Sequence, residues 1–165
     1  MVKKIFKEII FFSLAIFFIT NIVSYVRKPN LESNQIPKLL FTTIDGKSVD
    51  LNSSNGEPFV IHFWATWCPT CKLELSNIDI ISKEYKVITV AVNSGDSGKV
   101  RDFMKTKDMS FDVINDENGE LSNQFMVEAF PTTFILNANG EIIFSEVGYT
   151  STAGLLARLK WASEK

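Results

Sequence analysis

The stretch Phe63-Trp64-Ala65-Thr66-Trp67-Cys68-Pro69-Thr70-Cys71 carries the only two cysteines of the 165-residue chain. A nearly continuous apolar run at 59–65 leads into them, as expected for a central strand that is covered on both faces. Pro69 suits the first turn of a helix, and apolar residues at helical spacing follow over 75–81. The cysteines are therefore expected where a buried strand meets the N-terminus of a helix.

This position favours redox chemistry at the cysteine pair. The free amides and the dipole of a helix N-terminus lower the pKa of a thiol below its free value of ~8.5, so Cys68 is the predicted nucleophile. Cys71 lies one turn further into the helix. It is predicted to attack the mixed disulfide that Cys68 forms with a substrate and so to release the product. The pair itself carries the electrons, so no organic cofactor is required.

Other interpretations of the two cysteines have to be weighed. A structural disulfide across so short a loop constrains the unfolded chain only slightly. A structural zinc ion needs about four ligands, and the chain offers two cysteines and one histidine. A copper-binding or metallochaperone module remains the alternative, because paired thiolates are soft ligands. A thiol peroxidase, which needs only one activated cysteine, and a non-catalytic docking domain are further rivals.

Strands and helices alternate after the cysteine segment. Before it, Asp45-Gly46 separates 39–44 from 47–51, which predicts a hairpin because both turn positions accept positive φ. The later elements are expected in this order: a strand at 87–92, a helix near 100–104, a strand at 111–114, a helical turn at 121–125, strands at 132–136 and 142–147, and a helix near 155–159. This order predicts an α/β sheet that is only partly parallel.

The segment 63–71 resembles the active-site segment of thioredoxin-like proteins, specifically the membrane-anchored TlpA-like and ScsD-like protein disulfide oxidoreductases of bacteria. Further matching segments are 92–96, 113–116 with Gly119, Pro131-Thr132 and 147–150, so the resemblance covers most of the chain after residue 36. It implies a thioredoxin fold, a mixed central sheet flanked by helices, here with an N-terminal β-hairpin extension.

The resemblance also implies that Pro131 is cis and lies beside the cysteine pair. Proline is almost the only residue for which a cis peptide bond is affordable, although without the resemblance Pro131 would be an ordinary proline at the start of a strand. Phe130 is bulkier than the threonine or valine usual before this proline, which affects the expected shape of the substrate groove. Phe130 is a candidate substrate contact, together with Trp67, Pro69 and Thr70.

His62 and Glu74 are candidates for proton transfer. His62, the only histidine, precedes Cys68 by six positions, where thioredoxins carry a buried aspartate and many TlpA-like relatives carry asparagine. Its ordinary pKa near neutrality suits exchange of a proton with Cys71. Glu74 follows Cys71 by three positions, where the resemblance implies a proton-handling glutamate. The plain alternatives are a core histidine and a glutamate on a solvated helix face.

The N-terminal segment is predicted to be a membrane anchor. Residues 9–26 include no charged side chain, and about 18 helical residues at ~1.5 Å each give ~27 Å, enough to cross a bilayer core. Three lysines precede the run and two basic residues follow it, which slightly favours a cytoplasmic N-terminus. We predict a single transmembrane helix within the anchor 1–28, a tether at 29–36 and a thioredoxin-like domain at 37–165. A cleaved signal peptide and a buried helix are the alternatives.

These observations predict a single-pass protein of the bacterial inner membrane whose domain faces the periplasmic or extracytoplasmic side. Its substrates would be protein thiols and disulfides. We expect it to act as a reductant that a membrane electron carrier recharges, although the sequence fixes neither direction nor pathway, whether copper tolerance or cytochrome maturation. A net charge of -2 gives no electrostatic support for a nucleic-acid partner, and no metal is expected.

Overall fold

The computed structural model describes residues 2–29, 40–51, 54 and 56–165. A five-stranded sheet in the order β5-β4-β3-β6-β7 forms its centre. The strands are β3 (Phe59–Trp64), β4 (Lys86–Val92), β5 (Asp112–Asp116), β6 (Thr132–Leu136) and β7 (Ile142–Val147). β3 pairs parallel with β4 and antiparallel with β6, so the predicted mixed sheet is confirmed. The β3–β4 register places Trp64 opposite Ala91, and the central strand ends where the cysteine segment begins.

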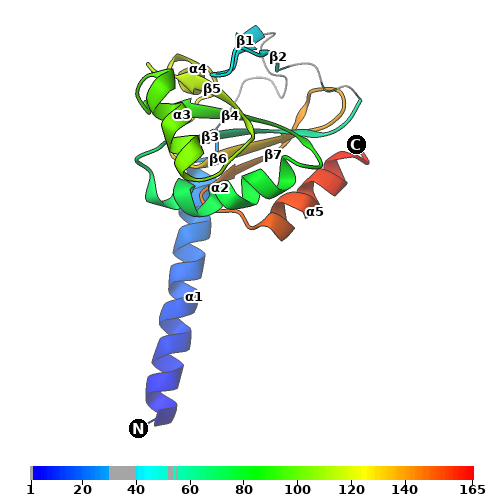
Figure 1. The fold of residues 1–165 in the computed structure, drawn as a ribbon. Helices are drawn as coiled ribbons and strands as arrows, with labels where there is room; N and C mark the ends of the chain where they lie inside the picture. The colour runs from blue at the N-terminus through cyan, green and yellow to red at the C-terminus, as the bar shows by residue number, and fades with distance from the viewer. Residues whose placement is uncertain (1, 30–39, 52–53, 55) are drawn as a thin grey trace.

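Helices cover both faces of this sheet (Figure 1). Alternate residues of β3 face opposite sides, so Val60 and Trp64 belong to one apolar core and Phe59, Ile61 and Phe63 to the other. The first core includes residues of α2 (Pro69–Ile81), α3 (Ser97–Thr106) and α5 (Thr152–Ala162). The second includes residues of α4 (Glu120–Gln124) and of the 40–51 hairpin. Because both faces are covered, β3 is apolar on both, as its sequence predicts.

The predicted hairpin is confirmed with shorter strands, β1 (Leu40–Thr42) and β2 (Ser48–Asp50), paired antiparallel. Gly46 takes a φ of 83° in the turn, a conformation that glycine adopts without steric cost. Several contacts join the hairpin to the domain, and two of them are made by the Ile44 backbone. The Ile44 N–H donates to the Val113 carbonyl oxygen at 2.8 Å, and the Arg101 guanidinium donates to the Ile44 carbonyl oxygen.

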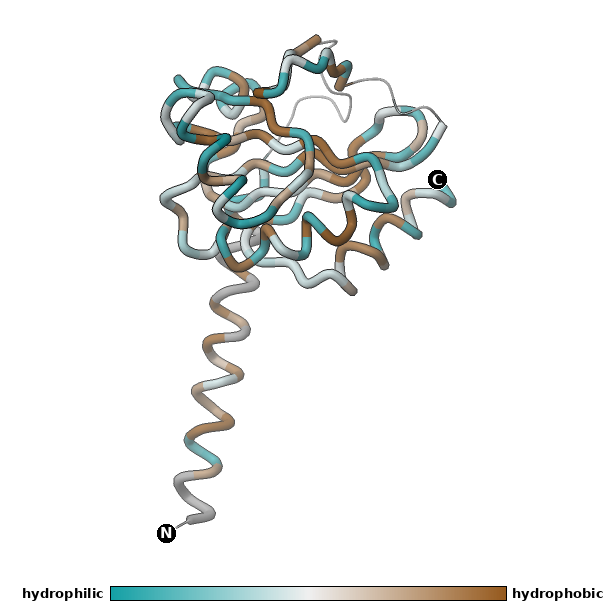
Figure 2. The backbone as a smooth tube through the Cα atoms, in the orientation of Figure 1, coloured by the Kyte–Doolittle hydropathy of each residue, from teal (hydrophilic) through white to brown (hydrophobic). Residues whose placement is uncertain are grey.

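Residues of the N-terminal segment form one helix, α1 (Val2–Val26), which projects away from the domain (Figure 1). Hydrophobic positions recur along it (Figure 2), and side chains such as Phe11, Ile16 and Ile22 are exposed. Within the described part of the chain, no helix is both long and apolar enough to cross a membrane. The predicted tether, 29–36, lies outside the described residues except for Pro29, as does the predicted start of the domain at residue 37.

Candidate active site around Cys68 and Cys71

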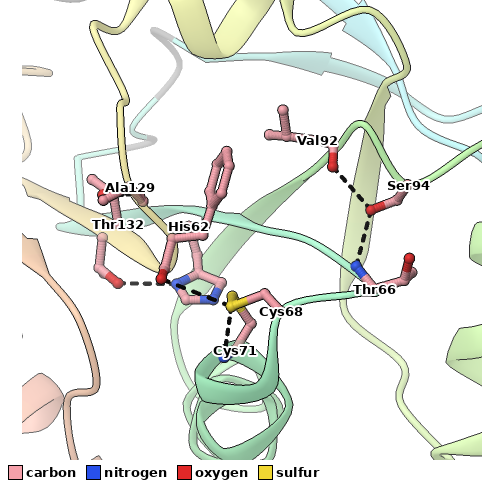
Figure 3. The surroundings of a disulfide bond; sticks show 10 residues. His62, Thr66, Cys68, Cys71, Val92, Ser94, Ala129 and Thr132 are labelled. Carbon is pink, nitrogen blue, oxygen red and sulfur yellow. Dashed lines mark hydrogen bonds between the residues drawn. A yellow bond between two sulfur atoms is a disulfide. The ribbon is translucent and has the colours of Figure 1, made fainter.

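The two cysteines lie where β3 gives way to α2, as the sequence predicts, and their sulfurs form a disulfide (Figure 3). Cys68 is the N-cap residue of α2, and its Sγ accepts a hydrogen bond from the Cys71 N–H at 3.1 Å. In the reduced protein this amide would stabilise a Cys68 thiolate. Cys71 is completely buried, whereas Cys68 is 4% exposed, so a substrate reaches Cys68 first.

The Phe130–Pro131 peptide bond is cis, as the resemblance implies, and this turn lies beside the disulfide. The Cys68 Sγ is 3.7 Å from the Phe130 carbonyl oxygen. A disulfide sulfur has no hydrogen to donate, so this is a contact in the oxidised form, and only the reduced thiol can donate to that oxygen. The Thr132 hydroxyl donates to the Ala129 carbonyl oxygen at 2.8 Å and steadies the turn (Figure 3).

An aromatic pair stands at the exposed rim of the site. Trp67 is 56% exposed, its indole N–H donates to the Asn93 carbonyl oxygen at 3.1 Å, and its ring meets Phe130 edge to face with 5.8 Å between centroids. At the next position after Asn93, the Ser94 hydroxyl accepts the Thr66 N–H at 3.0 Å and donates to the Val92 carbonyl oxygen at 3.0 Å (Figure 3). The 93–94 loop therefore positions the residues that enter the cysteine turn, a role that we did not infer from the sequence.

A hollow of about 700 Å³ opens beside this rim. It is lined by Thr70 and Phe130 from the site, by the 146–151 segment, and by residues of α5 and α1, and Trp67 and Pro69 are not among its lining residues. Arg158 and Glu146 form an ion pair at 3.1 Å on its wall. Of the four predicted substrate contacts, the structure thus places Thr70 and Phe130 in the hollow, Trp67 at the exposed rim, and Pro69 in the first turn of α2.

His62 is fully buried on the face of β3 that α2 covers and is drawn among the surroundings of the disulfide (Figure 3). Its Nδ1 is 2.9 Å from the Thr133 hydroxyl oxygen, and Nε2 has no hydrogen-bond partner among the described residues. Burial lowers the pKa of His62 to about 3. The expectation of a pKa near neutrality is therefore wrong, because desolvation keeps the imidazole uncharged.

Glu74 is completely buried as well, so the interpretation as a solvated helix residue is wrong. Burial raises its pKa to about 8, and the Thr150 backbone amide opposes this rise without reaching hydrogen-bonding geometry. Neither carboxylate oxygen has a hydrogen-bond partner among the described residues. Glu74 and Cys71 lie on the same side of α2, three residues apart. The site thus holds a carboxyl that is mostly protonated at neutral pH on the helix face of the inner cysteine.

A metal site would need several acidic, histidine or cysteine side chains close together, which allows the copper-binding alternative to be examined. In the ranges that the structure describes, no group of three or more His, Cys, Asp or Glu residues is placed to hold a metal ion. The copper-binding alternative therefore gains no support from the arrangement of the described side chains.

Comparisons with known proteins agree with this geometry. The Redoxin family model matches residues 31–159. A thioredoxin-like protein of Haemophilus influenzae is 31% identical over 163 residues, which cover 98% of this chain and 96% of the relative. The sporulation thiol-disulfide oxidoreductase A of Bacillus subtilis is 34% identical over 66% of this chain and 70% of its own. The crystal structure of StoA from Bacillus subtilis superposes with a TM-score of 0.65 at 29% identity, over 72% of this chain and 93% of that one.

Proposed function

The chain belongs to the Redoxin family and is a thioredoxin-like thiol-disulfide oxidoreductase, and on that premise we propose that Cys68 is its nucleophile and Cys71 its resolving cysteine. The observation that supports this most strongly is the hydrogen bond from the Cys71 N–H to the Cys68 Sγ at the start of α2. It favours negative charge on the sulfur that a substrate meets first.

In the reducing direction, the Cys68 thiolate attacks one sulfur of a substrate disulfide. That S–S bond breaks, one substrate sulfur leaves as a thiolate, and a mixed disulfide joins Cys68 to the other. The Cys71 thiolate then attacks the Cys68 Sγ, which expels the second substrate thiolate and leaves the Cys68–Cys71 disulfide. Two electrons pass to the substrate, and the oxidised pair is the form that the structure holds. With a dithiol substrate the same steps run in reverse, and the Cys68–Cys71 disulfide is reduced.

Cys71 must lose its proton before it can attack the mixed disulfide, and Glu74 is our candidate for the group that accepts this proton. With a pKa of about 8, its carboxyl can take and return a proton near physiological pH. His62, with a pKa of about 3, stays neutral and is not a base of matching strength. We propose that it acts through its neutral form, whose Nε2 has no hydrogen-bond partner among the described residues. An unchanged pH profile of thiol exchange in His62→Asn would remove His62 from the mechanism.

We further propose that the N-terminal segment anchors the domain to a membrane, with the cysteine pair on the extracytoplasmic side. The uncharged stretch at 9–26, the preceding lysines and the exposed apolar side chains of α1 support this. Substrates would then be exported proteins that carry thiols or disulfides, since disulfides persist outside the cytoplasm. An anchored reductant can be recharged by a membrane electron carrier, which is the partner that we propose.

The first test of the chemistry is to trap the mixed disulfide. In Cys71→Ser the second step is blocked, so a protein disulfide substrate should stay attached through Cys68 and appear as an adduct in non-reducing mass spectrometry. Cys68→Ser should form no such adduct, because Cys71 is buried. Equal adduct yields from the two variants would contradict the assignment.

The reduction potential tests the proposed direction. A value near ~-270 mV for the pair in the full chain in detergent would support a reductant, whereas one near ~-120 mV would indicate a donor of disulfides. A pair that forms no reversible disulfide would overturn the redox function itself.

A further inference from the structure

The segment 148–152, which joins β7 to α5, forms a roof over Glu74. The Gly148 N–H donates to the Pro131 carbonyl oxygen at 2.8 Å, so the segment begins against the cis-proline turn. Further along it, the Thr150 backbone amide is the group that approaches the Glu74 carboxyl. Glu74 is 0% exposed although it lies one turn from the start of α2. The roof is therefore part of the cover that separates the carboxyl from water.

Asn77, on the next turn of α2, holds the roof in place with both ends of its side-chain amide. Its Nδ2 donates to the Tyr149 hydroxyl oxygen at 3.1 Å and to the Thr150 carbonyl oxygen at 3.0 Å. Its Oδ1 accepts a hydrogen bond from the Thr152 hydroxyl at 3.0 Å. Two donors and one acceptor on a short planar group are what an asparagine supplies, and neither aspartate nor leucine of the same size offers that set.

We propose that Asn77 is a positioning residue, which holds the segment 148–152 over Glu74 and so shields from water the carboxyl that exchanges protons with the cysteine pair. Asn77 acts through this segment and makes no hydrogen bond to either sulfur. The inference rests on the proposed function, because it gives Glu74 a part in the exchange reaction.

Burial, and not a charged neighbour, governs the protonation of Glu74. The ionisable groups on the elements around it include Lys72 and Asp79 on α2, the neutral His62 on β3 and Lys160 on α5. Tyr149 lies in the segment itself, Arg158 and Glu146 pair with each other on the wall of the hollow, and Cys71 is held in the disulfide. None of them contributes to its raised pKa, of which burial is the larger cause and the Thr150 amide the smaller, opposing one. Opening the roof removes both effects, so the net change in the pKa is downward.

The test is the pH dependence of thiol exchange by the reduced full chain in detergent micelles. In the wild type we expect an inflection near the Glu74 pKa of about 8. Asn77→Ala should move this inflection down by about one pH unit or more, because admitted water favours the carboxylate. Thr152→Val, which removes one of the bonds to Asn77, should move it in the same direction by less. Ser76→Ala, on an exposed neighbour in α2, is the matched control and should leave it in place.

Glu74→Gln separates this inference from the proposed function. If Glu74→Gln leaves the inflection unchanged, the role of Glu74 in the reaction is wrong. If Glu74→Gln abolishes the inflection but Asn77→Ala and Thr152→Val leave it near its wild-type pH, the role of Glu74 stands and the positioning role of Asn77 is overturned. In the Glu74→Gln background, Asn77→Ala should change the pH profile no further, whereas a general loosening of the fold would still change it.

Discussion

Cys68 and Cys71 share one disulfide, yet their surroundings give the two sulfurs different chemistry. The Cys68 Sγ accepts a hydrogen bond from the Cys71 N–H at the helix N-terminus, and Cys68 keeps a small exposed surface, whereas Cys71 is buried in the core. Helix N-termini stabilise thiolates, and burial in apolar surroundings raises the pKa of a thiol. The division of roles between attacking and resolving sulfur therefore follows from their positions in one helical turn.

This asymmetry predicts selective alkylation. When the reduced chain is treated with iodoacetamide at neutral pH, Cys68 should react at least about tenfold faster than Cys71, because it has both the larger thiolate fraction and the access. Peptide mass spectrometry after a brief pulse measures the two rates. Replacing Cys71 with serine keeps the capping amide and should leave the rate at Cys68 high, while equal labelling of both cysteines in the wild type would contradict the prediction.

Trp67 allows a prediction about substrate size. Its ring is 56% exposed at the rim and is held by one hydrogen bond and the contact with Phe130. Trp67→Ala should slow exchange with a protein disulfide about tenfold, since exposed aromatic anchors carry much of the binding energy at such surfaces. Exchange with a small aromatic disulfide should change little. Trp161→Ala, 58% exposed on α5, is the control that should alter neither rate.

At the scale of elements, α5 matters for the site because its N-terminus continues the roof over Glu74. Ser151 is the N-cap of α5, and its hydroxyl accepts the Gly154 N–H at 3.2 Å. Ser151→Ala should lower the free energy of unfolding by about 1 kcal/mol through the lost cap. Urea denaturation measures this. Ser163→Ala, beyond the other end of the same helix, should cost less, and equal losses from the two would argue against a specific cap.

Elements that rest on local patterns are the ones that the sequence predicts well. The strand before the cysteines, the helix from Pro69 and the turn at Asp45-Gly46 each depend on neighbouring residues, and each is present in the structure. The cis bond before Pro131 has no such local signal and followed only from the family resemblance.

The states of Glu74 and His62 were not predictable in this way. Glu74 is buried by a segment more than seventy residues further along the chain, and His62 is buried between β3 and the helices packed on it. Their pKa values depend on this long-range packing. Residue type and spacing therefore identify the two residues as candidates for proton transfer but do not predict whether each is protonated at neutral pH. The bond pattern of Asn77 was missed for the same reason, because its partners lie at 149–152.

For the whole molecule, these two buried groups make the free energy of unfolding depend on pH with opposite signs. The pKa of His62 is lowered from 6.5 to about 3 on folding, so the stability associated with its neutral form is present above about pH 6.5 and is lost as the pH falls toward 3. The pKa of Glu74 is raised from 4.5 to about 8, so the stability associated with its protonated form is present below about pH 4.5 and is lost as the pH rises toward 8.

The two windows overlap between pH 4.5 and 6.5, where the opposite slopes cancel, so the free energy of unfolding should be highest and nearly flat there. It should fall by about 2 kcal/mol toward pH 3 and by about 2 kcal/mol toward pH 8. Urea denaturation of the oxidised full chain in detergent, followed by tryptophan fluorescence at a series of pH values, measures the curve. Glu74→Gln should abolish the alkaline fall and leave a curve that rises to about pH 6.5, and His62→Asn should abolish the acid fall and leave a curve that falls from about pH 4.5, because each removes one of the two proton-linked groups. A wild-type curve that does not fall between about pH 6.5 and pH 8 would mean that water reaches Glu74 in the folded protein, and it would remove the physical basis for a buried carboxyl beside the cysteine pair.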